Sequence, residues 1–387
     1  MRERKSRTGT RGRHVVVLNW RDPWHPEGGG SELYVHQVVR RLVAHGDRVT
    51  VFTAAYENAL DERGPAHPAL PRDVREGVTY VRRGGHLTVY LWAALFLLTR
   101  RFGHVDRVLE VQNGMPFLAT LFTRAPVVVL VHHVHREQWS AVVGPVLGKI
   151  GWWIESRFAP LLYRGCRYLT VSDETRRELA GLGIATSRTA VVRNGLDDPP
   201  PVRAERDRDP TLVVVGRVVP HKRVEHAVDV VARLAHRWPK LRLEVVGHGW
   251  WLDNLRKHIA ERDVADRVTL HGFVDEQDKH EILARSWVHL CPSVKEGWGI
   301  VIMEAAAHGV PSVAYRRAGG VAESIVDSET GLLAEDFEDL TSHVDQLLAD
   351  DELRTAMADA GRDRAGTFAW ENSVTEFEAV LVETAGL

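Results

Sequence analysis

The sequence is poor in cysteine, in charge imbalance and in long hydrophobic runs. Only Cys166 and Cys291 are cysteines among its 387 residues, so we expect no disulfide framework, and a reducing compartment, the cytoplasm, is favoured. The formal net charge of -2 at pH 7 argues against a general nucleic-acid binder, which is normally basic. We therefore expect no nucleic-acid partner, and any anion site must be local.

No apolar run is long enough to cross a bilayer. The most hydrophobic stretch, Leu87 to Leu98, has about a dozen residues, where a transmembrane helix needs roughly twenty. A second stretch, Val146 to Tyr163, mixes tryptophan, isoleucine and phenylalanine with lysine and arginine, as interfacial helices do. Both stretches also suit core helices. Cytoplasmic location is predicted, with peripheral contact at the inner face of the cell membrane kept open.

Length and hydrophobic pattern predict two α/β domains. A strand at His14 to Trp20, a glycine loop, a helix and a strand at Val49 to Phe52 form a βαβ unit, which implies a parallel sheet. After a proline-rich break at Asp197 to Pro210 the same pattern restarts with a strand at Thr211 to Val215. We predict two Rossmann-like, doubly wound parallel-sheet domains that face a deep cleft. They comprise residues 1–202 and 203–367, and a final helix over 368–387 crosses back onto the first domain.

Two carboxylates beside a glycine-rich turn are the most informative local feature. Glu296 precedes Gly297, Trp298 and Gly299, whose backbone N–H groups open a short apolar helix. Glu304 is the only charge in that helix, so its carboxylate should be buried and should need donors such as the ribose hydroxyls of a nucleotide. The structural alternative is that Glu304 pairs with a core arginine and Glu296 caps the helix.

Two cations follow the first strand of the second domain. Arg217 and Lys222 lie in a loop with no obvious acid opposite, and a guanidinium with an ammonium suits a diphosphate. A solvated basic loop is the alternative.

A glycine loop and a histidine cluster follow strands of the first domain. Gly28 to Gly30 would let a backbone approach a phosphate, although the loop lacks dinucleotide or P-loop spacing and could be a tight turn. His132, His133 and His135 follow an apolar strand, and no carboxylate or cysteine cluster in zinc spacing accompanies them. We expect His132 to donate to a substrate hydroxyl or to a backbone carbonyl rather than to bind a metal.

Four motifs in this order resemble the retaining glycosyltransferases of family 4 over almost the whole chain. They are N-G-L-D at 194–197, G-R-V-V-P-H-K at 216–222, E-G-W-G-I-V-I-M-E at 296–304 and A-G-G-V-A-E at 318–323. The resemblance implies the GT-B fold, with a nucleotide-sugar donor on the C-terminal domain and the acceptor on the N-terminal one.

The same resemblance implies a role for each candidate residue. Arg217 and Lys222 would neutralise the diphosphate, Glu304 would bind the ribose hydroxyls and Glu296 the sugar hydroxyls. His132 would contact the donor sugar. Because His133 follows it directly, either of the two could be the active-site histidine. The other donor-binding residues implied are the two loop glycines, a residue at the base, and the turn: Gly29, Gly30, Val274, Gly297, Trp298 and Gly299.

The function predicted is retaining transfer of a hexose-type sugar from a UDP or GDP sugar to a hydroxyl acceptor. Glycolipid, cell-envelope polysaccharide or glycoconjugate synthesis would use such a reaction, and the apolar stretches favour a lipid-linked acceptor. No cofactor and no metal are expected, because a D-x-D sequence occurs only in the linker, at Asp207 to Asp209. An NDP-sugar epimerase and a non-catalytic nucleotide-sugar-binding subunit remain alternatives. The donor, the acceptor and the oligomeric state stay open.

Overall fold

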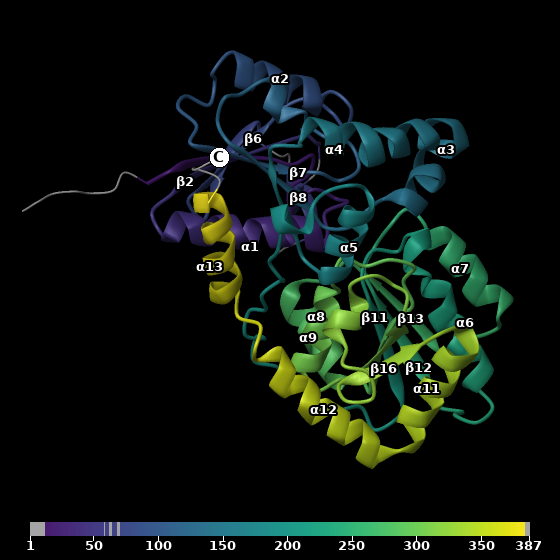
Figure 1. Cartoon of the computed structure of the whole chain (residues 1–387). Coiled ribbons are helices and arrows are strands. Elements are labelled where there is room, and N and C mark those ends of the chain that lie inside the picture. Colours follow the sequence, from purple (N-terminus) through teal and green to yellow (C-terminus); the bar gives the residue numbers. More distant parts are fainter. Residues whose placement is uncertain (1–11, 58, 62–63, 68–69, 384–387) are drawn as a thin grey trace, which may run out of the picture.

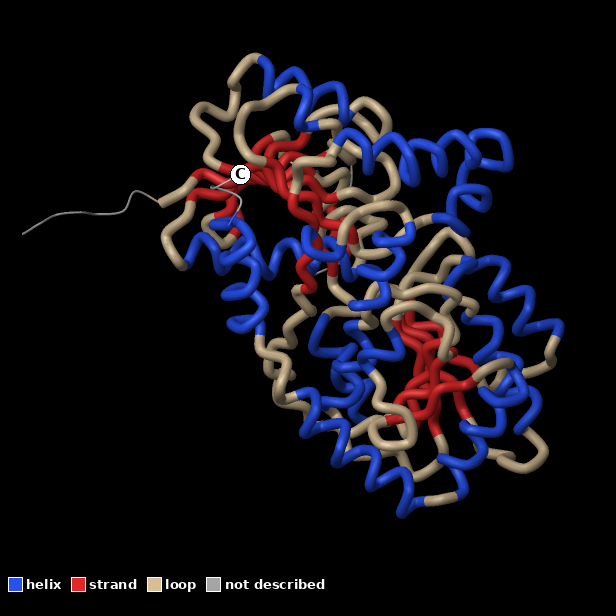
Figure 2. The backbone as a smooth tube through the Cα atoms, in the orientation of Figure 1, coloured by secondary structure: helices blue, strands red, loops and turns tan. Residues whose placement is uncertain are grey.

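Two sheets, each covered by helices on both faces, form the two halves of the molecule (Figure 1). The computed structural model describes residues 12–57, 59–61, 64–67 and 70–383. The first half lies above the second in this view, and the chain crosses between them twice (Figures 1 and 2). This arrangement confirms the predicted α/β, GT-B architecture.

The first sheet has the strand order β10-β9-β8-β7-β1-β2-β6-β5. Its strands are β1 (His14–Leu18), β2 (Arg48–Thr53), β5 (Arg72–Arg75), β6 (Val78–Arg82), β7 (Arg107–Val111), β8 (Val127–Val131), β9 (Arg167–Thr170) and β10 (Thr189–Val191). A separate hairpin pairs β3 (Ala59–Asp61) with β4 (Gly64–His67). The helices of this half are α1 (Gly30–Ala44), α2 (Val89–Leu98), α3 (Arg136–Trp153), α4 (Ala159–Leu162) and α5 (Asp173–Gly181).

One edge of this sheet departs from the prediction of a purely parallel sheet. Strand β5 runs antiparallel to β6, in register from Arg72 opposite Val81 to Arg75 opposite Val78. The two-residue connection has φ 49° at Glu76 and 76° at Gly77. Positive φ at both central residues gives the tight turn that joins antiparallel strands. The sequence reading missed β5 because its Arg-Asp-Val-Arg sequence carries no apolar strand pattern.

The side chains of each strand alternate between two cores. On β1, Val15 and Val17 pack against α1, whereas Val16 and Leu18 pack in the core under α2. This period of two is what a strand between two helical layers requires. The first sheet is therefore buried on both faces, as the near-continuous apolar strands predict.

The second sheet is parallel throughout, with the order β13-β12-β11-β14-β15-β16. Its strands are β11 (Thr211–Val215), β12 (Arg242–Val246), β13 (Val268–Gly272), β14 (Val288–Cys291), β15 (Ser312–Tyr315) and β16 (Gly331–Ala334). Its helices are α6 (Val224–Leu234), α7 (Leu252–Glu261), α8 (Glu276–Arg285), α9 (Ile300–Ala307), α10 (Val321–Ser324), α11 (Phe337–Ala349) and α12 (Asp351–Ala365). The predicted division at 202/203 falls in the connection between β10 and β11.

The last helix of the described chain, α13 (Trp370–Glu383), lies against α1 of the first half (Figure 1). Its buried face, with Val374, Phe377 and Leu381, joins the core between α1 and the sheet. Residues 384–387 of the predicted final helix lie outside the described residues. Within the described residues no helix is both long and apolar enough to cross a bilayer.

Shortening a fully buried side chain of α13 should destabilise the first half. Phe377 is completely buried, and replacing a core phenylalanine by alanine costs about 3–5 kcal/mol. We expect Phe377→Ala to lower the free energy of unfolding in urea by that amount. Val382→Ala, on the exposed side of the same helix, should change it little. Equal stability of the two variants would contradict this docking of α13.

Candidate active site

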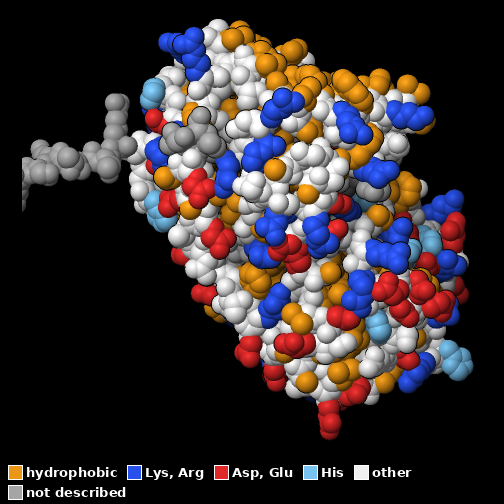
Figure 3. Space-filling view, viewed as in Figure 1, with side chains coloured by type: hydrophobic (Ala, Val, Ile, Leu, Met, Phe, Trp, Pro, Cys, Tyr) orange, Lys and Arg blue, Asp and Glu red, His pale blue; other side chains and the backbone are white. Residues whose placement is uncertain are grey.

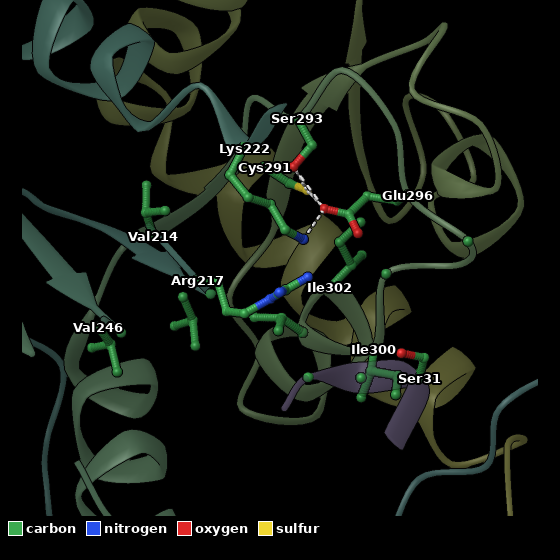
Figure 4. Close-up of a pocket in the computed structure, with 18 of the residues that line it drawn as sticks. Ser31, Val214, Arg217, Lys222, Val246, Cys291, Ser293, Glu296, Ile300 and Ile302 are labelled. Atoms are coloured by element: carbon green, nitrogen blue, oxygen red, sulfur yellow. Dashed lines mark hydrogen bonds and ion pairs between the residues drawn. The ribbon is translucent and has the colours of Figure 1, made fainter. Parts of the chain in front are cut away.

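A cavity of about 540 Å³ lies between the two halves, at the ends of β8, β11 and β14. It lies at the carboxyl ends of these parallel strands, where open α/β sheets bind ligands. Residues of both halves line it, and Figure 4 shows a close-up of its wall. All the predicted site residues line this cavity except Glu304.

Glu296 lies opposite Lys222, where the sequence predicted no acidic partner. Lys222 Nζ lies 2.5 Å from Glu296 Oε1, and Ser293 Oγ donates to the same oxygen at 2.6 Å (Figure 4). Burial alone would raise the pKa of Glu296, but Lys222 and Ser293 outweigh burial and hold the pKa below its ordinary value. The expectation of two unopposed cations was therefore wrong for Lys222, because the half-buried carboxylate of Glu296 lies opposite it and is stabilised by its charge.

The Glu296 turn is held by close backbone contacts on two sides. Gly320 N–H donates to the Glu296 carbonyl at 3.0 Å, and a Cβ on Gly320 would lie 2.0 Å from the Gly297 carbonyl oxygen. On the opposite side, a Cβ on Gly297 would lie 2.9 Å from the His132 carbonyl oxygen of the first half. Only glycine fits at Gly320 without moving backbone, so A-G-G and E-G-W-G form one structural unit. Trp298, with its side chain buried, anchors this unit beside Phe368.

Arg217 faces the glycine loop of the first half. Its Nη1 donates to the Glu27 carbonyl oxygen at 3.3 Å, and its side chain borders the cavity beside Gly29 and Gly30. Burial, followed by repulsion from Arg21, lowers the pKa of Arg217. Among the described residues it makes no ion pair with a carboxylate. A half-buried cation in this state would gain stability from a bound anion.

Both strand-end histidines line the cavity, and His132 is the more buried. The His132 ring packs edge-on against Tyr34, and its Nε2 has no hydrogen-bond partner among the described residues. Burial lowers the pKa of His132 to about 4, so the imidazole is neutral at neutral pH. A buried ring nitrogen without a protein partner fits a hydrogen bond to a ligand.

Glu304 is buried in α9, but it pairs with Lys279 rather than with a core arginine. Lys279 Nζ lies 2.9 Å from Glu304 Oε1 and 2.7 Å from Glu276 Oε2. Burial would lower the pKa of Lys279, but the two carboxylates outweigh it and raise the pKa to about 12. Glu304 Oε2 is buried without a partner among the described residues. Lys279 and Glu276 line the cavity, whereas Glu304 does not.

One group of described side chains could also be considered for a metal. The ligand atoms of Glu276, His280 and Glu304 lie within 4.8 Å of one another. The ammonium of Lys279 already contacts both carboxylates. A metal ion there would have to displace this ammonium, so we assign the group to the lysine.

Sequence reasoning missed several residues that complete the site: Ser293, His221, Lys279 and Phe273, all of which line the cavity. Ser293 stands three residues before Glu296, a spacing that could have suggested a side-chain hydrogen bond. Lys279 is 25 residues from Glu304 in sequence, and no local pattern links them.

Two family models match consecutive parts of the chain. The model described as Glycosyltransferase Family 4 matches residues 28–199, and the model described as Glycosyl transferases group 1 matches residues 199–364. The chain is also 29% identical over 377 residues to a GDP-mannose-dependent alpha-(1-6)-phosphatidylinositol monomannoside mannosyltransferase of Mycobacterium tuberculosis. That match covers 90% of this chain and 92% of the relative.

Solved structures share the fold. Sucrose-phosphate synthase from Thermosynechococcus elongatus has a TM-score of 0.77 at 18% identity, over 96% of this chain and 98% of that one. Anabaena Alr3699/HepE in complex with UDP and glucose has a TM-score of 0.71 at 16% identity, over 96% and 100%. Fold and site thus define a glycosyltransferase of the GT-B class. The chain belongs to glycosyltransferase family 4, which confirms the resemblance inferred from its motifs.

Removing the charge of Lys279 should destabilise the second half. Breaking a buried ion pair from one side costs about 3–5 kcal/mol, because the other charge stays buried. We expect Lys279→Met to show this loss in urea unfolding at neutral pH.

Two further variants make the Lys279 measurement specific. Lys279→Met combined with Glu304→Gln should recover part of the lost stability. Lys257→Met, which removes an exposed lysine of α7, should have little effect. A Lys279→Met variant as stable as the original chain would refute this pairing.

The buried histidine should make stability depend on pH. The His132 pKa is about 4 in the folded chain against an ordinary value of 6.5, so between these values the unfolded chain binds more protons and stability falls as pH falls. Its contribution is at most ~1.4 kcal/mol per pH unit. His132→Asn should reduce the slope of unfolding free energy between pH 6.5 and 4 by up to that amount. His104→Asn, at an exposed site, is the control, and an unchanged slope in His132→Asn would contradict a neutral buried ring.

Proposed function

We propose that this glycosyltransferase moves a hexose-type sugar from a UDP or GDP sugar to a hydroxyl acceptor, with retention of the anomeric configuration. The observation that carries the proposal is Arg217, a half-buried cation that lines the cleft, faces the glycine loop and has no carboxylate ion pair among the described residues. A nucleoside diphosphate would supply the missing negative charge.

The leaving group would be stabilised from both halves of the molecule. Arg217 would contact the diphosphate, and the N–H groups at the start of α1, which follow Gly29, would face it as helix N-termini face phosphates. Lys222 contacts the Glu296 carboxylate and also lines the cavity. Its ammonium group could therefore bind a phosphate oxygen while keeping its ion pair with Glu296. Preorganised cations are the main source of catalysis when negative charge develops on a departing group.

The reaction would break the bond between the anomeric carbon and the diphosphate oxygen, and the acceptor oxygen would bond to the same face of the sugar. The acceptor proton would pass to the departing diphosphate, which takes the bonding electron pair and so balances the step. This route needs no protein general base. Glu296, kept ionised by Lys222, would accept hydrogen bonds from sugar hydroxyls, and neutral His132 would offer Nε2 to another.

The nucleotide would occupy the part of the cavity next to α8. Val274 and Phe273 line it there and would contact the base, and Lys279 and Glu276 lie beside them. The Glu304 carboxylate would reach the ribose only if Lys279 or Glu276 moved, because these two border the cavity in its place. Metal independence is part of the proposal, because Arg217 and Lys222 would supply the positive charge that a metal ion would otherwise provide to the diphosphate.

The acceptor we propose is lipid-linked. A curated relative is a mannosyltransferase named for phosphatidylinositol monomannoside, and a structural neighbour was solved with UDP and glucose. His133 lines the first-half side of the cavity, and the chain leads from it into α3, so an acceptor would enter there.

The test is turnover of a panel of UDP and GDP sugars with lipid acceptors, in EDTA. Formation of a glycosylated acceptor with retained configuration would support the proposal. Conversion of the donor to another NDP-sugar without an acceptor product would indicate an epimerase, and binding without turnover would indicate a non-catalytic subunit. Activity that vanishes in EDTA and returns with Mg²⁺ would overturn metal independence.

Removing the guanidinium of Arg217 should greatly reduce the catalytic efficiency. Arg217→Ala should lower kcat/KM about 10²–10³-fold, the usual cost of removing one group that stabilises developing charge. Arg217→Lys should recover part of the rate, because a point charge remains. Arg256→Ala, at an exposed position on α7, is the control. Full activity in Arg217→Ala would refute the placement of the diphosphate.

A further inference from the structure

Helix α2 presents apolar side chains to solvent as well as to the core. Val89, Ala93 and Leu97 are buried, whereas Leu91 is 71% and Leu98 61% exposed. The helix contains no charged residue. A helix that is apolar all round is normally buried on every side, so this outer face lacks the cover that its composition predicts.

A second apolar stripe lies on α3. Val146, Leu147, Ile150 and Trp153 are between 52% and 72% exposed. Their spacing of one, three and three residues places them on one side of the helix. Leu161, after the π-helical turn Ile154–Phe158, continues the exposed apolar surface onto α4.

The two stripes cover the same side of the first sheet. The buried faces of α2 and α4 share one core cluster, through Val89, Ala93, Ala159 and Tyr163, so their outer faces point away from the sheet on the same side. Figure 1 shows α2, α3 and α4 together along the upper edge, and in Figure 3 orange and blue side chains gather along that edge. We call this surface the α2–α3 face: Leu87, Leu91, Trp92, Leu95, Leu98, Val146, Leu147, Ile150, Trp153 and Leu161.

The charges on these segments have one sign. From residue 82 to 105 the sequence has no aspartate or glutamate, and from 146 to 164 it has only Glu155. Glu155 is buried and accepts hydrogen bonds from His135 and Trp139. The exposed basic residues are Arg100, Arg101, Lys149, Arg157 and Arg164. In a chain with a net charge of -2 this is a strong local asymmetry.

We propose that the α2–α3 face docks onto an anionic lipid bilayer. Exposed leucines with arginines and lysines at their border, and two partly exposed tryptophans, suit the boundary between acyl chains and headgroups. Anionic headgroups complement the five basic side chains, each worth about fivefold in binding. The surface is open in the described chain, and none of its residues belongs to the cavity wall.

Docking would also place the cleft near the headgroups. Helix α3 starts directly after the His132 to His135 loop, and His132 and His133 line the cavity. A lipid-linked acceptor could then reach the cleft without leaving the bilayer, a link that rests on the proposed function. The docking surface itself does not depend on it.

The test is sedimentation of the full chain with phosphatidylcholine vesicles that contain or lack phosphatidylglycerol. We expect binding only with the anionic lipid and weaker binding in high salt. Leu91→Gln combined with Ile150→Gln should reduce the partition coefficient at least tenfold, and Arg100→Gln combined with Lys149→Gln about 25-fold. Val382→Gln, an exposed apolar residue on α13, should bind as the original chain does.

Nucleoside diphosphate binding by each variant separates the two proposals. Variants of the α2–α3 face should bind UDP or GDP as the original chain does, which also shows that they fold. Absence of vesicle binding by the original chain would overturn docking while leaving the transferase intact. A concentration-dependent dimer abolished by Leu91→Gln and Ile150→Gln, without vesicle binding, would overturn it in favour of a second copy. Vesicle binding without nucleotide binding would support the surface and count against the proposed function.

Discussion

The turn that carries Glu296 is held by backbone contacts that leave no room for side chains at two glycines. Gly320 meets the Gly297 carbonyl from within the second half, and Gly297 meets the His132 carbonyl of the first half. These contacts place the turn against both halves, and the Glu296 carboxylate that it carries lies 2.5 Å from Lys222 Nζ. A shift of this turn would change the cavity wall, the ion pair and the contact between the halves together.

Charge in the cleft follows a simple division. Lys222 forms an ion pair with Glu296, and Lys279 forms one with Glu304. Arg217 lacks such a partner among the described residues and contacts a backbone carbonyl of the glycine loop instead. The paired charges preserve the shape of the site, and the unpaired one is available to a ligand. A diphosphate would exchange the Glu27 carbonyl contact for a stronger, charge-assisted one.

Much of the fold could be predicted from the sequence, because long apolar strands and amphipathic helices have distinct periods. The strands predicted at Val49 to Phe52 and at Thr211 to Val215 lie where the structure has β2 and β11. Strand β5 was missed because edge strands with polar sequences lack that signal. The cluster of site residues followed from the rule that ligands bind at strand ends. The partners of Lys222 and Glu304 did not, since pairings over long sequence separations depend on tertiary packing. The site roles themselves stay predictions.

The central claim is that the cleft binds a diphosphate through protein cations. Isothermal titration calorimetry of UDP, GDP and their monophosphates in EDTA tests it most directly. We expect one diphosphate to bind, and the matching monophosphate to bind at least tenfold more weakly, because the second phosphate would face Arg217 and Lys222. Equal affinity for the diphosphate and the monophosphate, or no heat from any of them, would contradict the account.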